Sequence, residues 1–160
     1  MIGSVKPRLL ATMVTTTSYG TWLPGDLRGY VENGEILPGD PMRLAHSRQR
    51  MGERNPVLFS SAQQMVLFDA LQSACGEFEY RLTDVSIESW HLHWIVEHGF
   101  DPVATMVGRL KNRLRQALNV GRIWTEGYHD SLLFELAAIE ARRQYIARHA
   151  GCRMTNCIIR

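Results

Sequence analysis

The sequence predicts an α+β fold: a ferredoxin-like split βαβ sandwich of order β-α-β-β-α-β, with an added C-terminal helix. Three observations predict it. β-Branched and alternating apolar runs are typical of strands, two segments between them carry apolar residues at helical spacing, and a third such segment follows at the end. A chain of 160 residues normally forms one domain. Residues 1–160 are therefore predicted to be one domain, with a long loop or insertion at about 18–59.

The first elements are a strand and a long irregular stretch. Residues 9–17 are rich in β-branched side chains and predict the first strand. Glycine and proline then recur from residue 18 to about residue 59, which predicts a loop. A loop of this length inside a domain is usually functional or flexible.

A helix and two strands are expected next. Ser60 or Ser61 can cap the helix, and a core-facing stripe at helical spacing follows it: Met65, Phe68, Leu71, Cys75 and Phe78. Residues 80–86 and 89–97 then predict the second and third strands.

The remaining elements complete the order. Asp101 and Pro102 predict a helix start, with an acid at the cap and proline early, and Gly121 predicts its end. Its buried face is expected to be Val103, Met106, Val107, Leu110, Leu114 and Leu118. Residues 132–134 predict a short fourth strand, and residues 137–150 predict the final helix.

The charge distribution is more informative than the net charge of +2. Residues 109–122 contain no acidic residue and five basic ones: Arg109, Lys111, Arg113, Arg115 and Arg122. The last twenty residues add Arg142, Arg143, Arg148, Arg153 and Arg160. Such runs are often solvated surface, but two of them flanking one site favour a phosphate-bearing partner.

The three cysteines, Cys75, Cys152 and Cys157, form no CxxC motif. An odd number argues against a disulfide framework and favours a reducing, cytoplasmic location. His149, Cys152 and Cys157 resemble a zinc cluster only loosely, because the spacing is irregular and a fourth ligand is missing. No apolar run is long enough for a membrane span, and no signal segment is expected at the N-terminus.

His91 and His93 are the most informative residues. They are two apart on a predicted strand, so both side chains point to the same face, which suits joint metal binding. Packed or hydrogen-bonded histidines are the alternative for an isolated HxH. Tyr145 lies on the final predicted helix, and His149 is one turn later on the same face.

Together these residues favour phosphodiester chemistry. A divalent metal on His91 and His93 would neutralise an anionic phosphate oxygen. A tyrosine hydroxyl has a pKa near 10 and needs such a field to act as a nucleophile. Attack by Tyr145 would give a covalent phosphotyrosine, which keeps the bond energy for strand transfer.

The chain resembles the IS200-like tyrosine transposases, the single-tyrosine branch of the HUH nucleases, and especially their REP-associated members. The resemblance covers most of the chain. It is carried by residues 19–29 (YGTWLPGDLRG), His91-Leu92-His93, Leu110-Lys111, Trp124-x2-Gly127-Tyr128 and Tyr145.

The resemblance implies metal-dependent cutting and rejoining of hairpin-bearing single-stranded DNA. It implies that His91 and His93 are ligands of Mn²⁺ or Mg²⁺, that Tyr145 takes a 5′-phosphate, and that the protein forms a homodimer. His149 stands where the family commonly has a glutamine or asparagine ligand, and Trp90 where it often has asparagine. Because an all-nitrogen set suits manganese better than magnesium, we expect Mn²⁺ to support activity better; the alternative is that His149 faces solvent.

Further side chains are candidates for DNA binding. Lys111, Arg115 and Arg109 could hold the DNA backbone, or be ordinary surface charge. Trp22 and Tyr19 could stack on unpaired bases, or anchor the long loop to the core.

Two other functions fit parts of the sequence. One is a descendant that binds hairpin DNA without cutting it. The other is an RRM-like RNA-binding module on the same βαββαβ plan, although the third strand lacks the aromatic RNP1 pattern.

Overall fold

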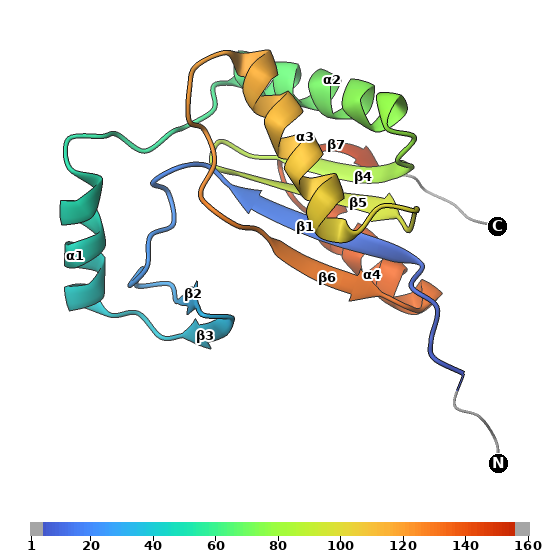
Figure 1. The fold of residues 1–160 in the computed structure, drawn as a ribbon, viewed down its shortest axis with the longest axis horizontal. Coiled ribbons are helices and arrows are strands. Elements are labelled where there is room, and N and C mark those ends of the chain that lie inside the picture. Colours follow the sequence, from blue (N-terminus) through green and yellow to red (C-terminus); the bar gives the residue numbers. More distant parts are fainter. Residues whose placement is uncertain (1–4, 156–160) are drawn as a thin grey trace.

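Residues 5–155 are described by the structure, a computed structural model, and they form a five-stranded sheet with helices on both faces (Figure 1). Its strands are β1 (Ala11–Thr17), β4 (Leu82–Ile87), β5 (His91–Glu97), β6 (His129–Leu133) and β7 (Cys152–Thr155). They run in the order β6-β1-β5-β4-β7, and every neighbouring pair is antiparallel. The predicted α+β class is confirmed.

The two faces of the sheet have separate cores. Helices α2 (Ser61–Glu77) and α3 (Val103–Leu118) cover one face, where they pack on Leu92, Trp94 and Val96 of β5. Helix α4 (Leu136–Ala147) covers the other face, where a smaller core includes Met13 and Ile95. Because strand side chains alternate, the odd-numbered residues of β5, the two histidines among them, face α4.

Helix α2 begins as expected but buries a different stripe. Ser60 accepts a hydrogen bond from the Gln63 backbone N–H, and the Gln63 side chain bonds the Ser60 N–H in return, which completes a capping box. Met65 was expected in the core but is 52% exposed, while Leu67 and Ala74 are buried. The stripe differs because α2 turns its Leu67 side toward α3 and the sheet.

Helix α3 buries four of its expected residues, packs the partly buried Val103 and Leu118 against the same core, and has different ends. Asp101 does not cap it: its carboxylate accepts hydrogen bonds from the Tyr80 hydroxyl and from Arg109, and the N-cap position is Pro102. The helix stops at Leu118 rather than at Gly121, because Asn119 adopts the left-handed conformation that ends helices.

Residues 18–59 contain regular structure, so the prediction of a loop is wrong for much of this segment. A hairpin of β2 (Tyr30–Glu32) and β3 (Glu35–Leu37) is followed by α1 (Pro41–Met51). The Asp40 carboxylate caps α1 by accepting from the backbone N–H groups of Met42 and Arg43. Figure 1 shows the hairpin and α1 to one side of the main sheet, near the end at which β5 begins.

The C-terminal elements differ from expectation in their bounds. Strand β6 begins three residues before the predicted strand at 132–134, and α4 ends at Ala147 rather than near residue 150. Strand β7 was not predicted; it adds an edge beside β4.

Cys157 and Arg160 lie outside the described residues. None of the helices between residues 5 and 155 has the length and hydrophobicity needed to cross a membrane.

Candidate functional site

The candidate site is centred on two buried histidines at the start of β5. His91 is 9% exposed and His93 is 5% exposed. Thr17 of β1 lies opposite His91 in the sheet and Thr15 lies opposite His93. Both imidazoles face α4, as the strand alternation predicts.

Helix α4 brings Tyr145 to this pair, and the turn that follows the helix brings His149 of the same chain. The Tyr145 ring centre lies 5.4 Å from that of His93 and 4.6 Å from that of His149. The His149 ring lies 4.8 Å from His93 and 5.8 Å from His91. The tyrosine is 41% exposed, so it stands at the solvent side of the histidines.

The three histidines can offer one nitrogen each to a common ion. These nitrogens all lie within 4.8 Å of one another. The His93 Nδ1 is 2.7 Å from the Thr15 hydroxyl, and the His149 Nδ1–H donates to the Tyr145 carbonyl at 2.8 Å. These bonds orient the rings and leave each Nε2 free, an arrangement common behind metal-bound histidines.

His91 is held differently. Its ring Nδ1 is buried and has no hydrogen-bond partner among residues 5–155. An unpaired buried polar atom is costly, and a metal ion would satisfy it. The Trp90 ring, whose centre is 4.0 Å away, is what restrains the imidazole. The donor set and this unpaired nitrogen fit a divalent metal.

Burial keeps both strand histidines neutral. It lowers the pKa of His91 to about 4 and that of His93 to about 3, and the other histidines of the site act in the same direction. Neutral imidazoles have the lone pair that a metal requires. At physiological pH these two side chains are therefore ready to bind a cation.

Contacts between tilted aromatic rings lead from the 18–59 segment to His91. Trp90 packs on Trp22 with ring centres 5.3 Å apart, and the Arg28 guanidinium lies 4.1 Å from the Trp22 ring centre. The Trp22 indole N–H donates to the Gly29 carbonyl, and Arg28 is paired with Asp26. Trp22 therefore joins its own loop to the histidine site.

The other predicted DNA contacts are mostly engaged within the protein. The Lys111 ammonium donates to the carbonyls of Thr125 and Gly127, and burial lowers its pKa. Arg109 is paired with Asp101 and bonds Tyr80.

The two remaining candidates are more open. Arg115 is exposed and bonds only Asn112 among the described residues. Tyr19 is partly buried beneath the Arg122 guanidinium, 4.6 Å from its ring centre.

A tight backbone contact sets the turn that follows His149. Gly151 packs so closely on β4 that an added Cβ would lie 2.0 Å from the Ile87 carbonyl oxygen. Its N–H donates to the Glu88 carboxylate at 2.7 Å, and its carbonyl accepts from the Ile87 N–H. The turn after α4 is thus fixed to the strand that neighbours the two histidines.

Thr15, Gly151 and the role of Trp90 were not predicted from the sequence. Thr15 could be recognised only once the register of β1 on β5 was known, and Gly151 only once the turn was placed.

The loosely proposed zinc cluster is not formed by the described residues: Cys152 is not part of the group around His149. His129 lies across from Thr15 on β6 and is exposed.

Comparisons with known proteins agree with this architecture at the level of fold. No protein-family model matches the chain, and no curated protein does. The chain shares its fold with a REP-associated tyrosine transposase solved bound to a REP hairpin, with a TM-score of 0.54 and 10% identity over 88% of this chain and 68% of that one. A candidate transposase from Deinococcus radiodurans R1 has a TM-score of 0.45 and 12% identity over 92% and 95%.

Proposed function

We propose that this protein is a transposase of the IS200-like tyrosine type, a metal-dependent single-stranded DNA endonuclease and strand transferase. The observation that carries the proposal is the meeting of His91, His93 and His149 with Tyr145 within one chain. The fold shared with a hairpin-bound REP-associated tyrosine transposase supports it. The substrate proposed is single-stranded DNA with a hairpin, and the protein is proposed to act as a homodimer.

Tyr145 is the proposed nucleophile. Its hydroxyl oxygen forms a bond to the phosphorus of a phosphodiester and loses its proton, while the bond from phosphorus to the 3′-oxygen breaks and that oxygen gains a proton. The products are a 5′-phosphotyrosine and a free 3′-hydroxyl. A 3′-hydroxyl of another strand can reverse the step, so DNA ends are exchanged without an external energy source.

His91, His93 and His149 are the proposed metal ligands. The bound metal, Mn²⁺ or Mg²⁺, would supply a positive charge that stabilises the anionic oxygens of the reacting phosphate. Thr15 and the Tyr145 carbonyl hold two of the three imidazoles in position. The partly exposed tyrosine lets a DNA strand reach its hydroxyl from solvent.

The architecture argues against the RRM-like alternative. Such modules stack bases on exposed aromatic side chains of an open sheet face. Here Trp94 is fully buried against α2 and α3, and α4 covers the opposite face of β5. No open aromatic strand surface remains on β5.

A covalent-adduct assay tests the proposal. Purified protein is incubated with labelled hairpin oligonucleotides from the DNA flanking its gene, with Mn²⁺, Mg²⁺ or EDTA. We expect a labelled protein band on a denaturing gel that requires metal and is absent in Tyr145→Phe. Tyr128→Phe is a matched control, since Tyr128 is also exposed but lies on the segment before β6. Hairpin binding without an adduct under either metal would favour the non-cutting descendant.

A further inference from the structure

The arginines of residues 5–155 divide into two groups. Those of the first group, of which some are only partly exposed, form ion pairs with carboxylates; they include Arg28 with Asp26, Arg43 with Glu32, Arg109 with Asp101 and Arg113 with Glu77. A second group is exposed and has no ion pair among residues 5–155; it includes Arg48 on α1, Arg54 after α1 and Arg122 after α3. An uncompensated cluster attracts anions more strongly than a neutralised one.

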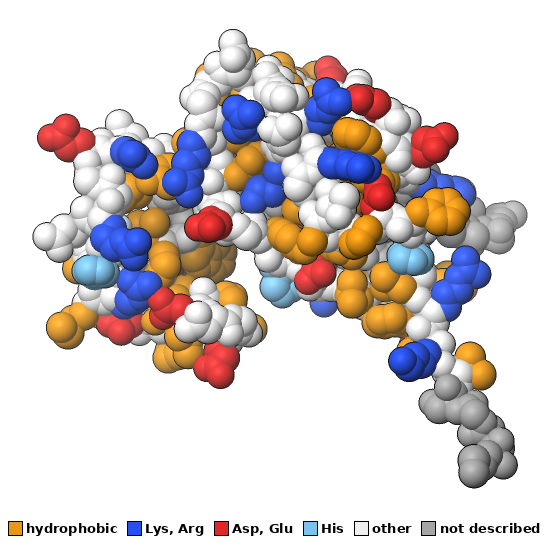
Figure 2. All heavy atoms as spheres, in the orientation of Figure 1, with side chains coloured by type: hydrophobic (Ala, Val, Ile, Leu, Met, Phe, Trp, Pro, Cys, Tyr) orange, Lys and Arg blue, Asp and Glu red, His pale blue; other side chains and the backbone are white. Residues whose placement is uncertain are grey.

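Backbone hydrogen bonds bring this second group together from three parts of the chain. The Tyr19 N–H donates to the Ile123 carbonyl and the Val57 N–H donates to the Tyr19 carbonyl, both at 2.8 Å. The segments that contain Arg54 and Arg122 therefore flank residue 19 on its two sides. In Figure 2 blue side chains recur over α1 and between it and the end of α3.

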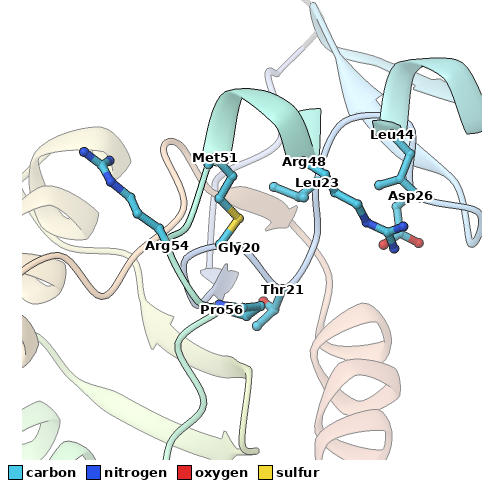
Figure 3. A pocket seen from close by; sticks show the side chains of 10 residues that line it. Gly20, Thr21, Leu23, Asp26, Leu44, Arg48, Met51, Arg54 and Pro56 are labelled. Atoms are coloured by element: carbon cyan, nitrogen blue, oxygen red, sulfur yellow. The ribbon is translucent and has the colours of Figure 1, made fainter. Parts of the chain in front are cut away.

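Arg48 and Arg54 also border a cavity of about 290 Å³ between the loop at 20–26 and α1. Figure 3 shows Arg48 extending toward Asp26 and Arg54 pointing outward. Asp26 is already paired with Arg28, and its pKa is lowered chiefly by hydrogen bonds to that arginine and less by the charge of Arg48, which is therefore partly compensated without an ion pair. Much of the remaining wall is apolar and comprises Leu23, Leu44, Met51 and Pro56.

The cluster adjoins the histidine site through the backbone. Thr17 is the register partner of His91, and the next residue, Ser18, donates its N–H to the Trp90 carbonyl. One residue further along is Tyr19, under Arg122. A polyanion bound on these arginines would therefore lie at the end of the sheet where the proposed metal ligands stand.

We propose that Arg48, Arg54 and Arg122 form a phosphate-binding surface for the single-stranded DNA that enters the histidine site. The inference rests on the proposed function and deepens it. In this proposal the main contacts to the DNA backbone lie on the 18–59 segment and on the loop after α3. They do not lie on α3, because its Lys111 and Arg109 bind other groups of the protein. Phosphate contacts of this kind fix the position of the strand without reading its sequence.

Binding of a 5′-labelled oligothymidine, measured by fluorescence anisotropy in EDTA over a range of salt concentrations, tests the surface apart from any cutting. We expect the triple variant Arg48→Ala, Arg54→Ala, Arg122→Ala to raise Kd at least about tenfold and to reduce the salt slope by about 2, near 0.7 per lost phosphate contact. The three Arg→Lys changes should restore most of the affinity, because lysine keeps the charge. Arg81→Ala is the matched control, since that arginine is 71% exposed and pairs with Glu97 at the far end of β5.

Wild-type affinity and salt slope in the triple variant would overturn the inference, as would tighter binding of an oligouridine RNA than of the DNA. An adduct at Tyr145 together with unchanged binding in the triple variant would leave the proposed function standing and this surface refuted. Weakened binding in the triple variant without any adduct from the wild type would support the surface and refute the nuclease.

Discussion

Each imidazole of the site is held by a different kind of neighbour. A hydroxyl orients His93, a helix carbonyl orients His149, and an indole ring packs on His91. Among the three imidazoles only that of His91 has no hydrogen bond at Nδ1 within residues 5–155, and the tilted Trp90 ring is the aromatic neighbour whose centre lies 4.0 Å from it. The resemblance implied asparagine at position 90, and this packing gives the tryptophan a structural role.

His149 should set the metal preference. With the three proposed nitrogen ligands, we expect Mn²⁺ to support adduct formation about tenfold better than Mg²⁺, because magnesium prefers oxygen ligands. His149→Gln replaces one imidazole with an amide oxygen and should narrow that difference. Initial rates of adduct formation with each metal measure it. Equal rates with both metals, unchanged in His149→Gln, would contradict the prediction.

Acid should destabilise the metal-free protein through His91 and His93. Their pKa values are about 4 and about 3 in the folded state, below the value of about 6.5 expected in the unfolded chain. The unfolded state therefore binds more protons as pH falls below about 6.5, and the free energy of unfolding decreases, by at most about 1.4 kcal/mol per pH unit for each histidine. Below pH 3 this contribution to the slope ends.

Urea denaturation in EDTA between pH 4 and 7 measures this effect. His93→Gln should flatten the dependence relative to the wild type, whereas His98→Gln, a change at an exposed histidine after β5, should not. Identical slopes in the wild type and His93→Gln would show that His93 titrates normally.

The site residues were partly predictable because two of them follow strand periodicity and two are spaced by about one helical turn. His91 and His93 share a face of β5 for that reason. Tyr145 and His149 come together although α4 ends at Ala147, because the chain continues into a turn in which the His149 N–H donates to the Ile146 carbonyl. The inward use of Lys111 was not predictable, since it depends on how the loop at 124–127 folds back over α3. Sequence spacing does not contain that information.

At the scale of elements, α4 completes the site by crossing the sheet face that carries the histidines. Ile139 and Ile146 anchor it in the core on that face, and Arg143 pairs with the buried Asp84 of β4. The turn at Gly151 then fixes the end of the helix to β4. The positions of Tyr145 and His149 follow from these three attachments.

Gly151→Ala should weaken metal binding. The new methyl group would collide with the Ile87 carbonyl, so the turn must shift and carry His149 away from the other two ligands. We expect metal affinity to fall at least about tenfold, as when the supports of metal ligands are changed, which calorimetric titration with Mn²⁺ measures. Gly108→Ala, on the open side of α3, should leave the affinity unchanged. If Gly151→Ala binds Mn²⁺ with the same affinity as Gly108→Ala and the wild type, the turn does not set the ligand geometry.

The elements that sequence analysis missed lack a hydrophobic stripe. Helix α1 buries only Leu44 and Ser47, so its apolar periodicity is absent, although its Asp40-Pro41 start and Gly52 end are typical helix signals. The Asn33-Gly34 pair, both at positive φ, is a strong hairpin signal between β2 and β3. Strand β7 has only four residues at an edge, too few for an alternating pattern.

At the scale of the whole molecule, the sheet brings distant parts of the chain to one end. The end of β1, the start of β5, the loop before β6 and the α4–β7 turn meet there. The 18–59 segment leaves the sheet at the same end, through the residues next to the histidine site. The proposed metal site, nucleophile and phosphate-binding surface are thereby adjacent within the described residues 5–155.

Locating the DNA–protein bond tests the central claim most directly. Protein reacted with hairpin DNA and Mn²⁺ is digested with nuclease and trypsin, and the peptides are analysed by mass spectrometry. The account predicts a nucleotide attached to the peptide of residues 144–148, in which Tyr145 is the only tyrosine, and retained as a 5′-phosphate ester. Attachment to a different tyrosine, or cleavage of the hairpin DNA with no modified peptide, would contradict it.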